Sequence, residues 1–487
     1  MIHIFGLSKN TLLKRDIIEV LDRTQEPISY KELQMDIPYV SLSTLKATCA
    51  ELAELLEQLY PDKNCFLQFS KEKKTISISL VRSSNNLQFF YDYIYSDDLA
   101  HDILQVLLLR RKFSTIEFCH AHGVSESKLK RKIKDINREL RSFDLYISCS
   151  NQLNLKGREV NIRAFHYILL RIVHRQFFTI PESAYLHETY QLGKYIADYL
   201  GVPNDLPLIE RFAYWVLITR TGLFKGEELQ FSAKEEQLIS NLVFPEKPVF
   251  LARWSEQDWQ FLLVAIHCSI SDYFRLETKD ENLAKTDSQE RWIELFQYYF
   301  RPLTIEEKRL AFEKLQQLDL TTYFFPLSTN FLLVLKEFIG LEDLAVMYPR
   351  YIQQFDCFWQ DWSMQFPDRN SEMFRMFSLL TSVTILPMEE LLPEVAVYAF
   401  SENNDAFKQY IKIKITFSFS NRYHLTFVDS PQKADLLIGT TNFYENDASP
   451  HQKYLIVRTR VYQRDLDDIS NALEAIIDRR LVESSQY

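Results

Sequence analysis

The sequence predicts a mainly α-helical, multidomain protein that ends in an α/β domain. Its 487 residues are enough for about three to five domains of typical size. Only nine glycines occur, and none lies between Gly6 and Gly123, so few turns can require a positive φ angle. Residues 391–487 instead contain short apolar runs bounded by polar clusters, which is typical of buried parallel strands.

Composition and cysteine usage narrow the class of protein. The chain is 46% hydrophobic and 14% aromatic, which argues against disorder. No apolar run approaches the roughly 20 residues that a membrane helix needs, and no signal-peptide pattern opens the chain, so we expect a cytoplasmic protein without membrane partners. The six cysteines lack metal-binding spacing, so we expect reduced thiols, no metal and no cofactor.

Residues 1–83 predict a first winged helix-turn-helix domain. An apolar stripe at 12–21 indicates one helix, and Ser29 followed by Glu32 forms the capping-box pattern that begins a second. A third helix is expected after Ser41. Two strands around a basic hairpin, the wing of such a module, are expected at 66–69 and 75–80.

Residues 84–160 repeat this plan. The heptads Val40–Lys46 and Val124–Lys130 both read V-S-x-S-x-L-K. Helices are expected near 98–110, 114–122 and 125–141, followed by a hairpin from 145–147 and 153–155. The same order of elements around two similar heptads indicates a tandem pair of modules.

The second module carries the strongest functional signal. Gly123 permits the tight left-handed turn between two helices, and Ser125 is a natural N-cap that directs free backbone N–H groups toward phosphate. The net charge is −10, but residues 110–141 hold ten basic and four acidic residues, and DNA binding depends on such a local basic face. The expected DNA-binding residues, with Arg131 on a base edge, are Ser125, Ser127, Lys128, Lys130, Arg131 and Lys134. The alternative is a basic, solvated helix in an ordinary bundle.

The first module is the weaker candidate for DNA contact because its third helix turns acidic after the first turn. Its expected contacts are Ser43, Thr44 and Lys46 on that helix, with Lys71, Lys73 and Lys74 of the wing on phosphates. The alternative is a purely structural winged domain.

The rest of the chain divides into a helical and an α/β part. Residues 160–390 predict two helical bundles that meet near 279–287, without strand-like alternation of useful length. In the α/β part, Ile411–Phe417 alternates like a strand but occupies the place of a helix in the β–α order, so both assignments stay open.

The run FSTIEFCHAHGVSESKLKRKIKDINRELRSFDLYIS from Phe113, with LKGREVNIR at Leu155–Arg163, resembles the helix-turn-helix of the Mga/AtxA virulence regulators. The order and size of the remaining parts are similar to theirs as well. The resemblance implies winged helix-turn-helix domain 1 at 1–83, Mga-like helix-turn-helix domain 2 at 84–160, PRD-like (PTS-regulation domain) helical domains at 161–280 and 281–390, and an enzyme IIB-like domain at 391–487.

The resemblance also implies control by the sugar phosphotransferase system (PTS), which phosphorylates PRDs on histidine. The candidate phosphorylation sites are His174, His187 and His267, although a buried, hydrogen-bonded histidine is the commoner explanation for the first and the last. No histidine lies between His267 and His424, so the second bundle cannot be a histidine phosphoacceptor.

The C-terminal domain departs from active enzyme IIB, which places a phosphoacceptor cysteine and a phosphate-cradling loop after its first strand. Here that place reads Phe400-Ser401-Glu402-Asn403-Asn404-Asp405, and residues 391–487 contain no cysteine. We therefore expect the domain to serve oligomerisation or partner docking.

Together these features predict a DNA-binding global transcription regulator, an activator without enzyme activity. Neither a P-loop nor a GxSxG motif occurs. The expected partners are double-stranded DNA, a second copy of the chain, PTS carrier proteins and RNA polymerase. One alternative is an RNA-binding antiterminator with PRDs, which would begin with a small β-rich RNA-binding domain. Others are a PTS component, which would need the missing cysteine, and a scaffold that does not bind DNA.

Overall fold

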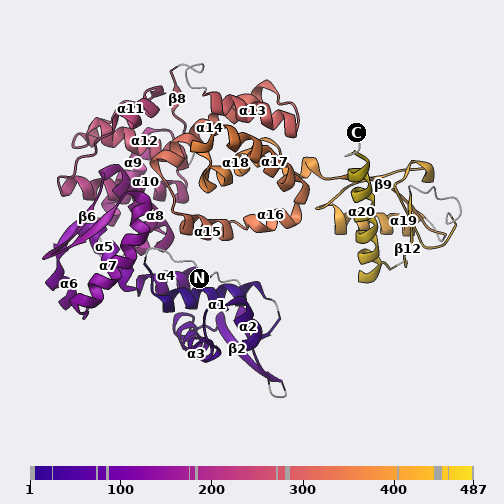
Figure 1. Ribbon diagram of the computed structural model, residues 1–487, viewed down its shortest axis with the longest axis horizontal. Helices are drawn as coiled ribbons and strands as arrows, with labels where there is room; N and C mark the ends of the chain where they lie inside the picture. The colour runs from indigo at the N-terminus through magenta and orange to yellow at the C-terminus, as the bar shows by residue number, and fades with distance from the viewer. Residues whose placement is uncertain are drawn as a thin grey trace. The chain divides into compact units, whose positions relative to one another are not determined.

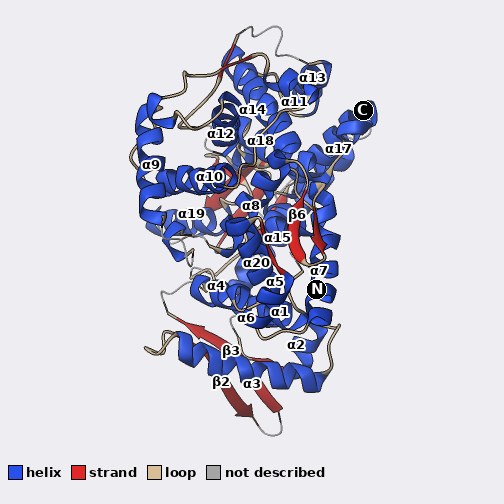
Figure 2. Ribbon diagram, turned by 90° about the vertical axis from the view of Figure 1, so that its left-hand side faces the viewer, coloured by secondary structure: helices blue, strands red, loops and turns tan. Residues whose placement is uncertain are grey.

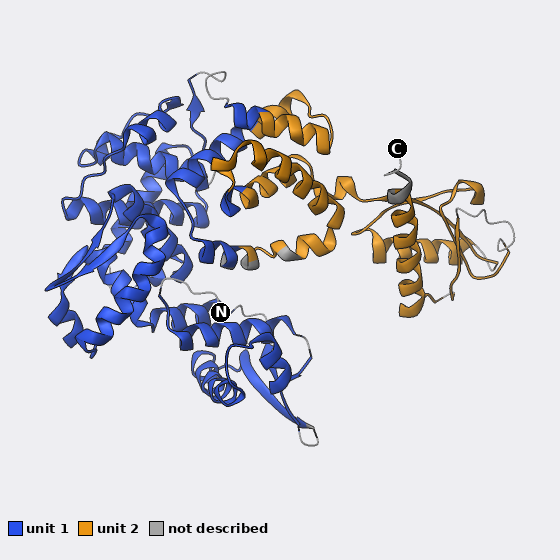
Figure 3. Ribbon diagram, viewed as in Figure 1, with its two compact units in different colours: residues 1–290, 312–335, 371–374 blue, residues 291–311, 336–370, 375–487 orange. Residues whose placement is uncertain are grey.

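The computed structural model describes residues 6–24, 26–72, 75–83, 87–174, 176–180, 185–269, 272–279, 286–402, 405–443, 452–458 and 460–484. Helices dominate this part of the chain (Figure 2), as the sequence predicted. The chain divides into two compact units (Figure 3). Unit 1 comprises residues 1–290, 312–335 and 371–374, and unit 2 comprises 291–311, 336–370 and 375–487.

The first module of unit 1 contains three helices and a three-stranded sheet (Figure 1). The expected capping box forms, because the Ser29 hydroxyl accepts from the Glu32 N–H group and the Glu32 carboxylate accepts from the Ser29 N–H group at 2.6 Å. Lys73 and Lys74, expected at the tip of the wing, lie outside the described residues. The elements are α1 (Lys9–Arg23), β1 (Ile28–Ser29), α2 (Tyr30–Asp36), α3 (Leu42–Leu59), β2 (Cys65–Glu72) and β3 (Thr75–Arg82).

The second module has the same topology as the first. Its sheet order, β4-β6-β5, matches the order β1-β3-β2 element for element, and all these pairs are antiparallel. Helix α4 (Gln88–Ser96) joins the modules. The sequence did not indicate β1 or β4, because strands of two or three residues show no alternation. The elements are α5 (Leu99–Arg110), β4 (Lys112–Ser114), α6 (Thr115–Ala121), α7 (Glu126–Leu140), β5 (Tyr146–Cys149) and β6 (Gln152–Lys156).

Helix α8 (Glu159–Val173) belongs to two hydrophobic cores. Its Phe165 packs in the core that both modules share, whereas its Ala164 packs in the core of the following helical body. The same helix bridges the two parts by charge: Glu159 pairs with Arg111 at 2.8 Å, and Arg163 pairs with Asp258 at 2.7 Å. It therefore crosses the domain boundary expected at 160.

The helical body of unit 1 packs around α10, whose Phe212, Trp215 and Ile218 are fully buried. A short antiparallel pair, β7 (Leu242–Val243) with β8 (Glu277–Thr278), interrupts a region expected to be entirely helical, because two-residue strands leave no pattern in the sequence. The principal helices are α9 (Leu186–Tyr199), α10 (Leu206–Phe224), α11 (Ala233–Ile239) and α12 (Glu256–Ser269). Helices α13 (Asp287–Tyr299), α14 (Ile305–Phe324) and α15 (Thr329–Phe338) contribute residues to both units.

Unit 2 ends in the α/β domain that the apolar runs predicted. Its four strands are parallel in the order β10-β9-β11-β12. The ambiguous stretch Ile411–Phe417 is helical, with Ile411 and Ile415 buried against the sheet. Its elements are α16 (Leu341–Met347), α17 (Pro349–Gln365), α18 (Glu372–Ile385, which begins in unit 1), β9 (Glu394–Phe400), α19 (Asp405–Phe419), β10 (His424–Phe427), β11 (Leu436–Gly439), β12 (Lys453–Ile456) and α20 (Gln463–Ser484). Within the described ranges, no helix has the length and apolar character to cross a membrane.

Candidate nucleic-acid interface

The turn between α6 and α7 depends on one glycine and one serine. Gly123 has φ 60°, and a Cβ built on it would meet no atom within 4 Å, so its backbone conformation alone favours glycine. The Ser125 hydroxyl accepts from the Lys128 N–H group at 3.3 Å and caps α7. The Val124 N–H group donates to the Cys119 carbonyl at 3.0 Å and closes the turn.

Helix α7 is sharply divided between an apolar and a basic side. One side packs into the module core through Leu129, Ile133, Ile136 and Leu140, all buried. The helical period of 3.6 residues places most of the remaining positions toward solvent. The exposed residues are those expected to bind DNA: Ser125, Ser127, Lys128, Lys130, Arg131 and Lys134.

The basic residues of α7 differ in how far their charges are already neutralised. Lys130 pairs with Glu126 at 2.5 Å, and this hydrogen bond raises the pKa of Lys130. Lys128, Arg131 and Lys134 form no ion pair within the part of the chain that the structure describes. These three are therefore the cations most available to a polyanion.

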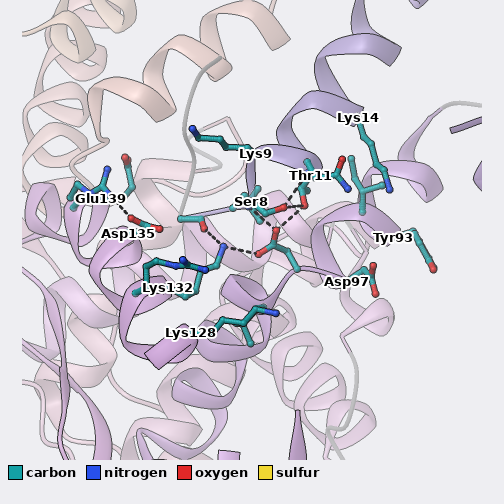
Figure 4. Close-up of a pocket in the computed structure, with 18 of the residues that line it drawn as sticks. Ser8, Lys9, Thr11, Lys14, Tyr93, Asp97, Lys128, Lys132, Asp135 and Glu139 are labelled. Carbon is teal, nitrogen blue, oxygen red and sulfur yellow. Dashed lines mark hydrogen bonds and ion pairs between the residues drawn. The ribbon is translucent and has the colours of Figure 1, made fainter. Parts of the chain in front are cut away.

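A groove of about 1160 Å³ runs beside α7 (Figure 4). Lys128 and Arg131 line it from α7, and Lys9 lines it from the start of α1. Arg138 also lines it and pairs with Asp135, although its side chain stays 67% exposed. We did not expect Lys9 or Arg138 at this surface. The spacing of seven residues from Arg131 to Arg138 could have indicated the second.

The residues that line this groove include Asp98, whose carboxylate is buried. It accepts from the Ser8 N–H group and from the Thr11 hydroxyl, each at 2.7 Å, and lies 3.4 Å from Lys132 Nζ. Burial alone would raise the pKa of Asp98, but hydrogen bonds from Ala100 and Ser8 and the charge of Lys132 lower it. Lys132 thus faces inward, unlike the other basic residues of α7.

The residues of the first module that we expect to bind DNA are exposed, but several of them contact neighbouring side chains of the same module. The hydroxyls of Ser43 and Thr44 each lie 2.8 Å from Ser41 Oγ, the N-cap of α3. Lys46 Nζ lies 5.5 Å from the centroid of the Tyr30 ring. Lys71 is exposed on β2. Helix α3 therefore offers one basic residue, Lys46, where α7 offers three cations without an ion pair among the described residues.

The three candidate phosphorylation sites differ in access. His174 is 4% exposed and His267 is 7% exposed, and burial lowers the pKa of each to about 4. His174 packs against His101 with 5.5 Å between ring centroids, and His267 Nδ1 accepts from the Leu276 N–H group at 3.3 Å. His187 alone among the three is exposed, in the first turn of α9.

Residues 83–170 match the family model of the Mga helix-turn-helix domain. The matched span begins shortly before α4, contains the whole second module and ends within α8. No curated protein is similar enough to the chain to count as a match. Residues 83–170 are thus a Mga helix-turn-helix domain, as the resemblance indicated.

Proposed function

We propose that the protein regulates transcription by inserting α7 into the major groove of duplex DNA. The observation that carries the proposal is the division of α7, with its apolar side in the core and Lys128, Arg131 and Lys134 exposed and not ion-paired within the described residues. An α-helix fits the major groove, and the residues near the N-terminus of a recognition helix reach base edges. Arg131 is the base-reading candidate, and Ser125 and Lys128 are phosphate contacts.

The test is binding of the full chain to duplex DNA across a salt series. Lys128→Ala combined with Arg131→Ala should weaken binding and flatten its salt dependence. Lys225→Ala combined with Arg253→Ala removes the same charge from exposed positions in the helical body and should change neither. Unchanged binding of the first variant at matched salt would contradict the assignment, and tighter binding to a hairpin RNA than to the duplex would favour the antiterminator alternative.

The first module assists as the second half of a tandem reader. Its topology equals that of the second module, and both pack in one core, which supports a joint DNA surface. Mapping of binding sites across the genome for the wild type and for the α7 double variant would identify target promoters. Expression measured at those promoters would test activation through RNA polymerase.

The helical bundles serve as PRD-like sensors of phosphotransferase status. The exposure of His187 beside Glu188 favours this histidine as the phosphoacceptor over the buried His174 and His267. A phosphoryl group adds up to two negative charges and can alter packing around α9. The second bundle has no histidine to modify and acts as a scaffold.

The C-terminal domain joins subunits instead of transferring phosphate. Its first strand ends at Phe400, whose ring lies against the backbone of Gly439, and the Glu402 carboxylate accepts from the Thr440 hydroxyl nearby. Asn403 and Asn404 of the expected loop lie outside the described residues. An aromatic ring and a carboxylate leave this strand end unsuited to phosphate. Exposed apolar side chains on α19 supply a surface for a second copy.

A further inference from the structure

The groove beside α7 has a wall from each DNA-binding module. Lys9, at the first position of α1, belongs to the first module, whereas Lys128 and Arg131 belong to the second. Figure 4 shows Lys9 and Lys128 on either side of Ser8 and Lys132. All three cations are exposed residues.

Most acidic side chains that line the groove already form hydrogen bonds or ion pairs within the protein. Asp98 is bound by Ser8, Thr11 and Lys132, and Asp135 pairs with Arg138. Glu139 accepts from the Asn330 side chain at 2.9 Å. Asp97 is exposed and opposes the cations as the remaining acidic group. Lys9, Lys128 and Arg131 form no ion pair with any described residue, so the groove presents positive charge to a ligand.

We propose that this groove holds the sugar–phosphate backbone of the duplex whose major groove receives α7, with Lys9 as a phosphate contact from the first module. The inference rests on the proposed function and adds to it a contact outside both recognition helices. Lys128 and Arg131 belong to the exposed side of α7 and to the groove lining alike. A duplex seated on α7 therefore brings a backbone strand to the groove.

The size and lining of the groove favour a DNA strand over a small anion. Its volume of about 1160 Å³ exceeds the range of about 300–1,000 Å³ that is typical of small-molecule sites, which are also mostly apolar. Phosphate contacts of this kind fix the register of a protein on DNA without reading sequence. Lys9 suits that task, because Ser8 and Thr11 on either side of it are fixed to Asp98.

The test measures the salt dependence of binding between the full chain and a mixed-sequence duplex of about 30 base pairs. Lys9→Ala should lower the magnitude of the log–log slope by about 0.9, the value of one lost phosphate contact. Lys9→Arg should retain the slope. Lys31→Ala, which removes an exposed lysine of the same module on α2, should leave it unchanged. Matching thermal melts would show that each variant is folded.

The outcomes separate this inference from the proposed function. If Lys128→Ala with Arg131→Ala weakens binding but Lys9→Ala keeps the wild-type slope, the groove contact is wrong and the α7 assignment stands. If the α7 double variant binds normally, the proposed function fails. Equal slope losses in Lys9→Ala and Lys31→Ala would indicate a general charge effect and overturn the contact. The contact would also be overturned if Lys9→Ala abolished the binding of pyrophosphate, measured by calorimetry, but left the salt slope of DNA binding unchanged.

Discussion

The carboxylate of Asp98 lies 3.4 Å from Lys132 Nζ and joins three helices of the two N-terminal modules. Asp98 caps its own helix, α5, through the Ala100 N–H group at 2.9 Å, and it accepts from Ser8 and Thr11 at the start of α1. Lys132, from α7, donates in turn to the Gly6 carbonyl at 2.9 Å. One buried charge thus sets the position of the first module relative to the recognition helix.

Replacement of Asp98 should therefore cost stability and DNA affinity together. Asp98→Ala removes a helix cap and leaves Lys132 without its buried partner, so we expect a loss of about 2–4 kcal/mol in the free energy of unfolding. Asp98→Asn keeps one acceptor oxygen, which can still cap α5 through the Ala100 N–H group, and should cost less than Asp98→Ala. Urea unfolding measures the first effect and DNA titration the second. Equal stability of Asp98→Ala and wild type would show that the junction does not depend on this carboxylate.

Gly123 offers a test of the turn that is independent of charge. Gly123→Ala forces a Cβ into a left-handed conformation and should cost about 1 kcal/mol, whereas Gly123→Asn should cost less. Gly201 provides a matched control, because its φ of 69° is similar and a Cβ there also meets no atom within 4 Å. Both alanine variants should lose similar stability, but only Gly123→Ala should weaken DNA binding, as measured by fluorescence anisotropy.

The buried histidines should make stability sensitive to mild acid. Burial lowers the pKa of His101, His174 and His267 to about 4, below the ordinary 6.5. Between these values the unfolded chain binds protons that the native chain does not, so stability falls as the pH falls from about 6.5 to about 4. His101→Gln combined with His174→Gln should reduce this dependence in urea unfolding at several pH values. His187→Gln, at an exposed position, should leave it intact.

Phosphotransfer should discriminate among the three candidate histidines. Incubation with a phosphorylated PTS carrier protein should label His187, because a buried imidazole cannot reach a donor protein. The measurement is acid-labile phosphate located by mass spectrometry. His187→Ala should abolish the label while His267→Gln retains it. A label on His174 or His267 in folded protein would contradict the exposure argument.

The exposed side of α19 predicts where subunits meet. Tyr410, Ile413 and Phe417 are 45%, 68% and 84% exposed along this helix. Ile413→Glu combined with Phe417→Glu should shift the protein toward monomer in sedimentation velocity, because charge on an apolar interface opposes its burial. Gln409→Glu combined with Thr416→Glu adds the same charge at exposed positions off this stripe. A wild-type chain that stays monomeric at all concentrations would remove the basis of the proposal.

Local chemistry made much of the fold predictable. Capping serines and an apolar period located α2, α3, α6 and α7, because these signals lie within a few residues of each other. Lys9 as part of the groove could not be predicted, since Lys128 and Arg131, which line the same groove, lie more than a hundred residues away in sequence. The same holds for the bond from Lys132 to Asp98, which joins residues 34 apart in sequence.

The shared helix α8 has a consequence for how a signal would travel. Its residues complete the core of the two N-terminal modules and that of the helical body, and its charges join Arg111 to Asp258 through Glu159 and Arg163. The modules and the helical body are joined by one continuous helix that packs in both cores. A change in the packing of the helical body must therefore either move α8, and α7 with it, or be resisted by both cores. We therefore expect the protein to switch between discrete conformations instead of changing gradually.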